Sequence, residues 1–590
     1  MKPHRALTIV GLFILSMCHA ASDAAGDYVL SRGRQLLLDH GLQIQSLVHP
    51  QGFSDIELWK SANFSTYDFW EWTNLEVLQQ LPANQQWARQ YEANNPDTKY
   101  LSEGELTRKN TLVRYQYGDE LTEDDLLSPA RLSDMAATYA EWRQLYPNAI
   151  VHTNSDTQVP ASALATYMQA AQPDMVMFDY YPQFSFPASD RMAWYSAMQT
   201  YRLAGLAGND GTSTAPIPYA QFLNLFRGSY EEPNASESFV GLQQFASWAF
   251  GYTLVDGFIY THIGSPVETL AAVMFDTEDD SSPNEGFDYV QETNRLSHNV
   301  GPALVRMIST DIRMIPGRNG SLPNPLPSGL SAWSAGTANT GDYADYITSI
   351  QPTVSQGGAN DTTYSDVLIG YFDPLLSDNS GATFVDGLHF MIVNGSATGM
   401  ALQSAQWYHL TFDFADSGFD SLVQLSRDTG QVDLVSLTHL SGSTYYLDLN
   451  LPGGMGDLLG FWDSRNPLPT MPDPSTVGGD YNGNGTVDAA DYVVWRDTLG
   501  ASVTAGRGAD GNANGMIDAD DYDFWRARFG NYVPDPLGSG SSAVVPEPTA
   551  INLALLAISL GLIGMRIKVW DNVWRTRCRS RLGLQAVDCT

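Results

Sequence analysis

The first half of the chain alternates short apolar runs with segments of helical periodicity. Seven of these runs have the length and the aromatic or β-branched content of strands. They lie at residues 42–49, 64–70, 111–120, 149–154, 174–181, 217–226 and 255–262. The segment 128–147 is typical of the helices expected between them, because it begins with a serine N-cap and ends at a proline.

Strand–helix units repeated this often predict a parallel α/β barrel of the (β/α)8 TIM type over residues 27–318. The eighth strand is expected between Asn74 and Lys109. A doubly wound open sheet is the structural alternative. Both folds gather functional side chains at the carboxyl ends of their strands, so the search for chemistry begins there.

The pattern changes after the predicted barrel. Residues 319–362 are rich in Gly, Pro, Ser, Asn and Thr, which predicts a linker. Residues 363–463 contain several runs that alternate apolar and polar positions, with a hairpin signal, "DTG", at residues 428–430. They predict an antiparallel β-sandwich. A second proline-rich linker follows at residues 464–478.

Two acidic, glycine-containing loops come next. "DYNGNGTVDAADYVVW" starts at Asp480 and returns as "DGNANGMIDADDYDFW" from Asp510. Their oxygen-bearing positions have the spacing of a calcium loop, with Thr486 and Met516 offering backbone carbonyls. The side-chain ligands expected are Asp480, Asn482, Asn484, Asp488 and Asp491 in the first loop, and Asp510, Asn512, Asn514, Asp518 and Asp521 in the second. The spacing predicts two Ca²⁺ sites; a solvated linker is the alternative.

Aspartate in the last ligand position, and one helix after each loop, resemble type I dockerin repeats. The resemblance covers residues 479–532 and implies a small α domain that folds on calcium and has a cohesin-like partner. Four aromatic residues depart from the cellulosomal pattern at the surface that would contact cohesin. They are Tyr492, Trp495, Tyr522 and Trp525.

The N-terminus predicts export. Basic residues precede an apolar run, and Ala20 is a small residue suited to cleavage, so residues 1–20 are expected to be a signal peptide. A buried helix and a lipoprotein site at Cys18 are the alternatives. The other two cysteines, Cys578 and Cys589, lie in the C-terminal tail. The exported body therefore has neither a disulfide scaffold nor a catalytic cysteine.

The C-terminus predicts a membrane anchor. A "PEP" box closes the segment 533–548, an uncharged run leads into a helix expected at 549–565, and basic residues dominate the cytoplasmic tail 566–590. This arrangement resembles the PEP-CTERM sorting signal. It implies an exosortase-like sorting protease and a protein held in the cell envelope or released outside, with the anchor removed on sorting.

Composition narrows the function further. With 31 basic against 66 acidic residues, the net charge of −35 disfavours nucleic acid as a partner. No H-E-x-x-H, G-x-S-x-G, P-loop or G-x-G-x-x-G motif stands in a fitting context. Zinc hydrolases, serine hydrolases and nucleotide enzymes are therefore disfavoured, and no cofactor is expected for catalysis.

The predicted strand ends gather carboxylates, amides and aromatic rings. Sugar-cleaving sites need a carboxyl acid, a second anionic or neighbouring group, and flat rings for the sugar to stack on. The catalytic candidates are Glu120, Asp119 and Asp179. The substrate-binding candidates are His49, Trp70, Glu71, Trp72, His152, Asn154, Tyr180, Tyr181, Gln221 and Tyr260.

Glu120 is the best candidate for the acid. The period of two along "VRYQYGDE" places the apolar residues on one face and Glu120 on the other, pointing into the barrel mouth if the apolar face packs on helices. A solvated acidic loop is the alternative. Asp179 ends a second strand, where it either orients substrate or caps a turn. No glutamate stands at the end of the strand at residues 217–226, where retaining barrel glycosidases keep their nucleophile.

The stretches "YQYGDEL" and "DMVMFDYYPQF", followed by a β-rich domain, resemble bacterial glycoside-hydrolase-like (β/α)8 proteins, some of them β-galactosidase-like. The resemblance implies a carbohydrate-active barrel with Glu120 as acid/base. "GDE" also resembles the Asp–Glu pair of β-hexosaminidases, and "MVMFDYY" is similar to a strand of chitinase-like barrels. These similarities imply that Asp119 or Asp179 assists an acetamido group of the substrate. The alternative is a catalytically inactive carbohydrate-binding or scaffold protein.

Overall fold

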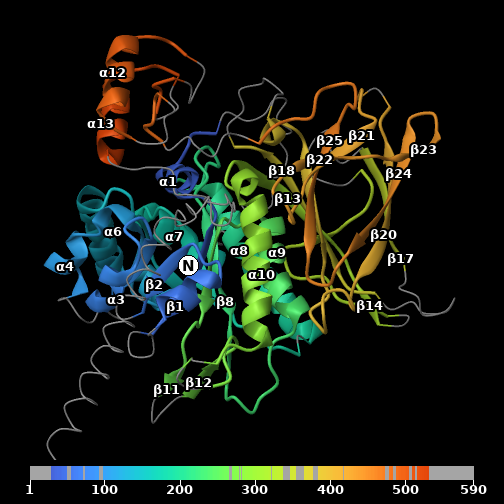
Figure 1. The fold of residues 1–590 in the computed structure, drawn as a ribbon, viewed down its shortest axis with the longest axis horizontal. Coiled ribbons are helices and arrows are strands. Elements are labelled where there is room, and N and C mark those ends of the chain that lie inside the picture. Colours follow the sequence, from blue (N-terminus) through green and yellow to red (C-terminus); the bar gives the residue numbers. More distant parts are fainter. Residues whose placement is uncertain are drawn as a thin grey trace, which may run out of the picture. The chain divides into compact units, whose positions relative to one another are not determined.

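The computed structural model describes most of the residues between Tyr28 and Phe529 (Figure 1). The described residues are 28–49, 55–70, 73–91, 98–185, 187–264, 269–277, 280, 282–319, 322–336, 346–353, 364–375, 383–415, 417–471, 478–482, 487–503, 508–511 and 515–529. All the described residues lie within one compact unit.

Parallel strands form the sheet of the N-terminal domain. They are β1 (Gln43–Val48), β2 (Thr66–Phe69), β3 (Gln86–Tyr91), β4 (Leu112–Tyr117), β5 (Ile150–His152), β6 (Asn154–Asp156), β7 (Val176–Asp179), β8 (Tyr219–Asn224) and β10 (Leu254–Phe258). Their order is β5-β4-β3-β2-β1-β10-β8-β7-β6. Only Thr153 separates β5 from β6, so the two ends of the sheet are halves of one strand.

The sheet is therefore a closed barrel of eight strands, and the open-sheet alternative is wrong. β4 pairs with β5 and β7 pairs with β6, which completes the circle through Thr153. The strand that the sequence pattern had left undefined is β3, which lies inside the interval between Asn74 and Lys109.

Helices surround this barrel. They are α1 (Arg32–His40), α2 (Ile56–Ser61), α3 (Leu75–Gln80), α4 (Glu103–Leu106), α5 (Glu123–Leu127), α6 (Pro129–Leu145), α7 (Ala161–Ala171), α8 (Ala188–Ala207), α9 (Glu237–Phe250) and α10 (Glu285–Leu304). As expected, Ser128 caps α6 by accepting a hydrogen bond from the Arg131 amide. Trp142 of α6 stacks on Tyr115 of β4, with ring centroids 4.0 Å apart. The apolar face of β4 therefore packs on helices.

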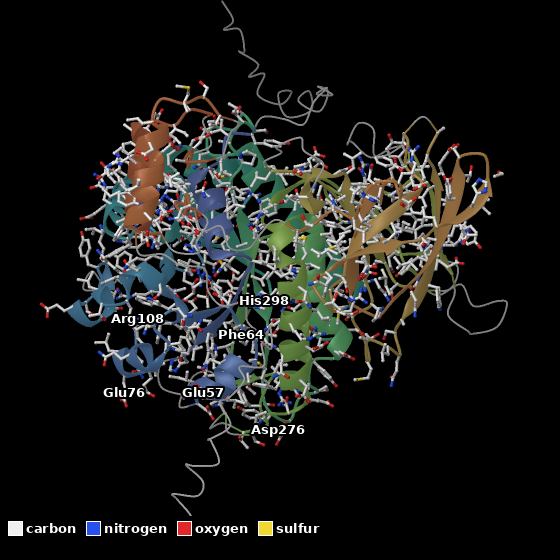
Figure 2. All side chains as sticks on the ribbon, turned by 45° about the horizontal axis from the view of Figure 1, so that its top comes forward. Glu57, Phe64, Glu76, Arg108, Asp276 and His298 are labelled. Atoms are coloured by element: carbon white, nitrogen blue, oxygen red, sulfur yellow. The ribbon has the colours of Figure 1, made fainter. Side chains whose placement is uncertain are left out.

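The amino-terminal end of the barrel is closed by α1. Leu36 and Leu37 join the apolar cluster inside the strands, together with Met175 and Leu254. Helix α10 is hydrogen-bonded to the segment that leads into β2. His298 lies 2.8 Å from the Asn63 carbonyl oxygen; Figure 2 labels His298 and Phe64, the residue after Asn63.

The second domain is a β-sandwich. Its larger sheet has the order β16-β13-β18-β19-β25-β21-β22 and its smaller sheet β17-β20-β24-β23, and an apolar core fills the space between them. The strands are β13 (Met307–Ile315), β16 (Ser331–Ala332), β17 (Ile347–Thr353), β18 (Val367–Pro374), β19 (His389–Asn394), β20 (Gln406–Asp413), β21 (Ser421–Leu425), β22 (Val432–Val435), β23 (Thr438–Ser441), β24 (Thr444–Leu451) and β25 (Gly456–Trp462).

The sandwich begins earlier than the predicted boundary at residue 363. β13 pairs with β18 over its full length, and β17 pairs with β20. The predicted barrel range therefore includes one sandwich strand, and the predicted linker includes others. The cause is that β13 follows α10 directly, so composition does not change where the domain does.

Helix α9 is shared by the two domains. All its residues from 238 to 250 are buried, and the helix contacts β18 and β19. Gly370 of β18 lies so close to Ala249 that a Cβ atom there would come within 2.0 Å of the Ala249 carbonyl oxygen. A side chain at this position would force the sheet away from the helix.

The repeat module, residues 479–532, contains the helices α12 (Ala489–Thr498) and α13 (Ala519–Arg528). The two loop–helix units are joined reciprocally. The Trp495 indole donates to the Asp518 carbonyl oxygen (2.7 Å), and the Trp525 indole donates to the Asp488 carbonyl oxygen (3.0 Å).

The aromatic residues of the module were expected at a partner-contacting surface; Tyr492, Trp495 and Tyr522 are half-buried, and Trp525 is buried. Tyr492, Trp495, Tyr522 and Trp525 contact one another, with ring centroids 5.1–5.9 Å apart. Val487 and Trp525 form the buried cluster of the module, and Tyr492 and Tyr522 pack against it half-buried. In a domain this small, aromatic rings supply much of the buried area.

Within the described part of the chain, no helix combines the length and apolar character needed to cross a membrane. The predicted signal peptide, sorting box, anchor and tail lie outside the described residues.

Candidate active site

Asp119 and Glu120 lie in a short bulge at the carboxyl end of β4. Gly118 has φ +65° and Glu120 has φ +46°, so the chain turns through the left-handed region. Leu121 then returns to the ladder beside β6, where its amide donates to the Asn154 carbonyl oxygen (3.0 Å) and its carbonyl accepts from the Asp156 amide (3.1 Å). A left-handed glutamate is uncommon and is held here by strand pairing on both sides.

Asp119 is fixed by amide donors. Its Oδ1 accepts hydrogen bonds from Gln116 Nε2 (2.9 Å) and from Asn154 Nδ2 (2.8 Å). Burial raises the pKa of Asp119, the Asn154 donor lowers it, and the charge of Glu120 raises it. Asp119 is exposed at the mouth, but the protein around its carboxyl displaces much of the water. Desolvation is therefore the largest effect on the pKa of Asp119.

Asp179 and Glu120 form a carboxyl pair across the barrel mouth. Asp179 ends β7 and is 9% exposed, whereas Glu120 is exposed. Burial raises the pKa of Asp179 to about 9, and the charge of Glu120, the hydrogen bond with its carboxyl and the charge of Asp119 raise it too. Two carboxyls in hydrogen-bond contact share one proton. The better buried Asp179 holds that proton at neutral pH.

Aromatic rings line the mouth beside the carboxyls. Trp70 contacts His49 and Phe258, with ring centroids 5.5 and 5.4 Å apart. Tyr181 contacts Phe258 and Phe226 at 5.4 and 5.2 Å. Burial, followed by the charges of Asp179 and Asp119, raises the pKa of the Tyr181 hydroxyl, so this ring lies close to the carboxyls.

Three predicted substrate-binding residues do not face the mouth. Gln221 lies between β8 and the helices, where it accepts from the Trp194 indole (2.9 Å) and donates to Ser247 (2.6 Å). Tyr260 is buried among aromatic rings of the core. Tyr180 donates its hydroxyl to Asp190 at the start of α8 (2.5 Å). Gln221 was predicted at a strand end, but β8 continues to Asn224, and the Gln221 side chain bonds to the helix layer instead.

The other predicted residues divide into two groups. His49, Trp70, Asn154 and Tyr181 lie at the mouth as described above. His152 is buried inside the barrel, where burial and the charge of Arg114 hold its pKa well below the usual value. Glu71 and Trp72 lie outside the described residues.

Sequence reasoning missed a charged group inside the barrel. Arg114 of β4 is bonded to Asp68 of β2 and to Asp256 of β10, and all three are almost fully buried. One charged residue stands inside each of three otherwise apolar strands, which is a signal that the sequence carried. Sequence reasoning also missed the mouth residues Phe226 and Phe258.

The repeat module holds a second group of acidic residues. Asp480, Asp491, Asp510 and Asp521 are buried. Asp491 accepts hydrogen bonds from the Asn482 amide (2.9 Å) and the Asp488 amide (2.7 Å). Burial raises the pKa of Asp491, the two amide donors lower it, and the charges of Asp480 and Asp488 raise it.

The second loop repeats these bonds. Asp521 accepts from the Asp518 amide (2.7 Å), and Asp510 accepts from the Gly515 amide (2.8 Å). Among the described residues, no three His, Cys, Asp or Glu side chains are grouped as a metal site. The remaining candidate ligands Asn484, Thr486, Asn512 and Asn514 lie outside the described residues, and Met516 lies within them.

No protein-family model matches the chain, and no curated protein matches it. Among solved structures, a glucosidase from Croceicoccus marinus is 12% identical at a TM-score of 0.30, covering 74% of this chain and 99% of its own. A glycoside hydrolase family 5 protein from Bacteroides vulgatus is 8% identical at a TM-score of 0.40, covering 76% of this chain and 98% of its own. At these scores the likeness decides neither fold nor function.

Proposed function

We propose that the protein is a glycoside hydrolase acting on an oligo- or polysaccharide, with Glu120 as general acid/base. The observation that carries the proposal is the hydrogen-bond contact of Asp179 with Glu120 at the carboxyl end of the barrel, where burial and this neighbour raise the pKa of Asp179 to about 9. General acid catalysis at neutral pH needs a carboxyl that keeps its proton there. The adjacent rings of Trp70 and Tyr181 suit stacking against a sugar.

In this proposal the pair acts as one acid/base unit. Glu120, the exposed member, receives the shared proton and gives it to the glycosidic oxygen as the bond to the anomeric carbon breaks. The anionic Asp119 stabilises the positive charge on the sugar ring, either directly or through an acetamido group of the substrate. A water molecule adds its oxygen to the anomeric carbon and returns a proton to the pair.

The test compares the wild-type protein with Glu120→Gln on a panel of aryl glycosides and polysaccharides. We expect hydrolysis to fall by about 10²–10⁴-fold, the usual range for loss of a general acid. Glu123→Gln is the matched control, because Glu123 is an exposed glutamate three residues away in the first turn of α5. Equal loss in both variants would contradict the assignment.

A second candidate function is carbohydrate binding without hydrolysis. β8 ends at Asn224, whose side chain donates to the Pro182 carbonyl oxygen (2.9 Å), so this strand end carries no carboxylate nucleophile. A wild-type protein that binds glycans but cleaves none of the panel would favour this alternative over hydrolysis.

We further propose that the repeat module is dockerin-like and binds two Ca²⁺ ions. The residues fit the ion, because four buried carboxyls crowd the two loops and a divalent cation would neutralise them. Asp480, Asn482, Asp488 and Asp491 would contribute to the first site. Asp510, Asp518 and Asp521, with the Met516 carbonyl, would contribute to the second. Bound calcium would supply the charge that lets these loops fold.

The cellular setting of the proposal rests on the sequence alone. We propose an exported protein that is sorted to the cell envelope through its C-terminal segment, by an exosortase-like protease. A cohesin-like partner of the repeat module belongs to the same proposal. Fractionation of cells that express the full chain tests the export, since retention in the cytoplasm would contradict it.

A further inference from the structure

Gln116 connects the barrel interior to the candidate active site. Its Oε1 accepts a hydrogen bond from Arg114 Nη1 (3.2 Å). Its Nε2 donates to the Gly118 carbonyl oxygen (3.0 Å) and to Asp119 Oδ1 (2.9 Å). A guanidinium only donates and a carboxylate only accepts, so the two ends of the amide are not interchangeable here. Arg114 therefore determines that the donor end of Gln116 faces Asp119.

Arg114 itself has a fixed orientation. Its Nη2 bonds to Asp68 and, at 2.5 Å, to Asp256, and the three side chains are at most 2% exposed. Burial raises the pKa of Asp256 well above its usual value, and the charge of Asp68 raises it further, whereas Arg114 lowers it. Asp68 and Asp256 come from strands on the two sides of β1, so the arginine is held from across the barrel.

The orientation of Gln116 affects the protonation of Asp179 through the charge of Asp119. Both hydrogen bonds to Asp119 Oδ1 come from amide donors, which favour the ionised carboxylate. The negative charge of Asp119 then favours a proton on Asp179. Among the described residues, burial raises the pKa of the Tyr181 and Tyr201 hydroxyls, and both lie close enough to the pair for the charge of Asp179 to raise it further.

We infer that Arg114 and Gln116 are positioning residues that hold Asp119 as an anion and thereby keep one proton on the Glu120–Asp179 pair. Neither touches the reacting atoms in this arrangement; each acts through Asp119. The inference rests on the proposed function for its catalytic meaning, but the position of the proton can be measured without any substrate.

The test is a pH titration of the carboxyl C=O stretch by infrared difference spectroscopy on the full chain. Asp119→Asn and Asp179→Asn identify the bands of the two groups. In Gln116→Met the midpoint of Asp119 should rise by about one pH unit, because the loss of a hydrogen bond to a charged group is about 1.5 kcal/mol or more. The midpoint of the Glu120–Asp179 proton should fall in the same variant to the extent that Asp119 takes up a proton in the pH range where the pair titrates, because a protonated Asp119 no longer repels the anion of the pair.

The matched control is Gln43→Met. Gln43 is also a buried glutamine of a barrel strand, but it bonds to Gln86 (3.0 Å) and to the His40 carbonyl oxygen (3.1 Å) at the amino-terminal end. It should leave both midpoints in place. Opposite shifts in Gln116→Met are not expected from a merely structural loss. Unchanged midpoints in a folded Gln116→Met protein would overturn the inference.

A second variant covers the case in which Gln116→Met does not fold. Asn154→Ala removes another amide donor to Asp119, from a different strand than Gln116. It should move both midpoints in the same directions as Gln116→Met, and unchanged midpoints would show that Asp119 does not control the pair. A wild type that hydrolyses nothing, yet gives the expected shifts, would sink the proposed function alone. Hydrolysis without the shifts would sink this inference alone.

Discussion

Two groups of buried or crowded carboxyls in this protein have different neighbours. At the barrel mouth, Asp119 accepts from side-chain amides and Asp179 shares a proton with Glu120. In the repeat module, Asp491 and Asp521 accept from backbone amides at the starts of α12 and α13. Both places put like charges close together; at the mouth two carboxyls are in hydrogen-bond contact with each other, whereas Asp491 and Asp521 of the module have backbone donors.

The difference indicates how each group is neutralised. A proton can bridge two carboxyl oxygens in contact, which suits acid/base chemistry. Carboxylates spread along a loop, each with its own backbone donor, leave oxygens for a larger cation. The mouth is therefore expected to respond to pH and the module to Ca²⁺, and each response can be tested separately.

The largest expected effect is the removal of calcium. A chelator should unfold the module while the barrel stays folded, and excess Ca²⁺ should restore it, because metal binding and folding are coupled in small metal-binding domains. The fluorescence of Trp495 and Trp525 and the far-ultraviolet circular dichroism of the full chain measure the two domains together.

Variants sharpen this experiment. Asp521→Asn should lose the calcium response of the second loop, whereas Asp523→Asn should keep it, because Asp523 is exposed and pairs with Arg526 on the helix surface (3.0 Å). A full chain whose spectra ignore both chelator and Ca²⁺ would contradict the comparison.

The next effect is the pH dependence of stability caused by Asp179. Its folded-state pKa is raised to about 9, while an unfolded aspartate titrates near 3.9. Between these values the folded state holds a proton that the unfolded state has lost, so stability falls as pH rises across this window. The limiting slope is roughly 1.4 kcal/mol per pH unit.

Asp179→Asn should flatten this slope of stability against pH. Denaturant unfolding at about pH 5, 7 and 9, within the window of about 4 to 9, would measure the slope in both proteins. The variant should therefore gain stability relative to the wild type as the pH rises. A variant with the parent's slope would show that the proton sits elsewhere. Asp190→Asn is a useful control, because Asp190 bonds to Tyr180 and not to the carboxyl pair.

A smaller effect is expected from the reciprocal indoles of the module. Trp495→Phe and Trp525→Phe each keep a ring in the core and remove one hydrogen bond between the two loop–helix units. Each should cost about 1 kcal/mol of module stability. Because each bonded carbonyl belongs to the opposite loop, each variant should also weaken the linkage between the two calcium binding steps, as read from the steepness of a Ca²⁺ titration. If both variants titrate with Ca²⁺ as steeply as the wild type, the expected linkage is wrong.

The smallest effect concerns the bulge after β4. Gly118→Ala places a Cβ 3.2 Å from Leu121 at a φ of +65°. It should destabilise the protein by roughly 1 kcal/mol. Gly211→Ala has a similar φ, +72°, with nothing within 4 Å of its Cβ, so it isolates the backbone part of the cost. Thermal unfolding compares the two, and a smaller loss at Gly118 than at Gly211 would contradict the expected crowding.

Much of the barrel was predictable because its strands are local patterns. The period of two along β4 correctly predicted that its apolar face packs on helices, as the stacking of Tyr115 on Trp142 shows. Strand ends correctly brought Glu120 and Asp179 together, since parallel strands finish at one edge. These inferences need only the direction of each strand and the alternation of side chains.

The remainder depends on contacts between distant residues. Gln221 bonds to Trp194 and Ser247 rather than to the mouth, and no local pattern distinguishes these faces of a fully buried strand. The start of the sandwich at β13 depends on its partner β18, fifty or more residues later in the chain.

The bulge at residues 118–120 has a consequence for how this barrel can be altered. The chain leaves the ladder after Tyr117 and rejoins it at Leu121, so the fold is secured on both sides of the two acidic residues. We expect that the two acidic residues of such a segment can be replaced, or further residues inserted beside them, while the barrel keeps its fold. Libraries randomised at Asp119 and Glu120, with Gly118 kept for its positive φ, would sample new chemistries on an intact barrel, and the same freedom lets a lineage gain or lose a reaction without losing the protein.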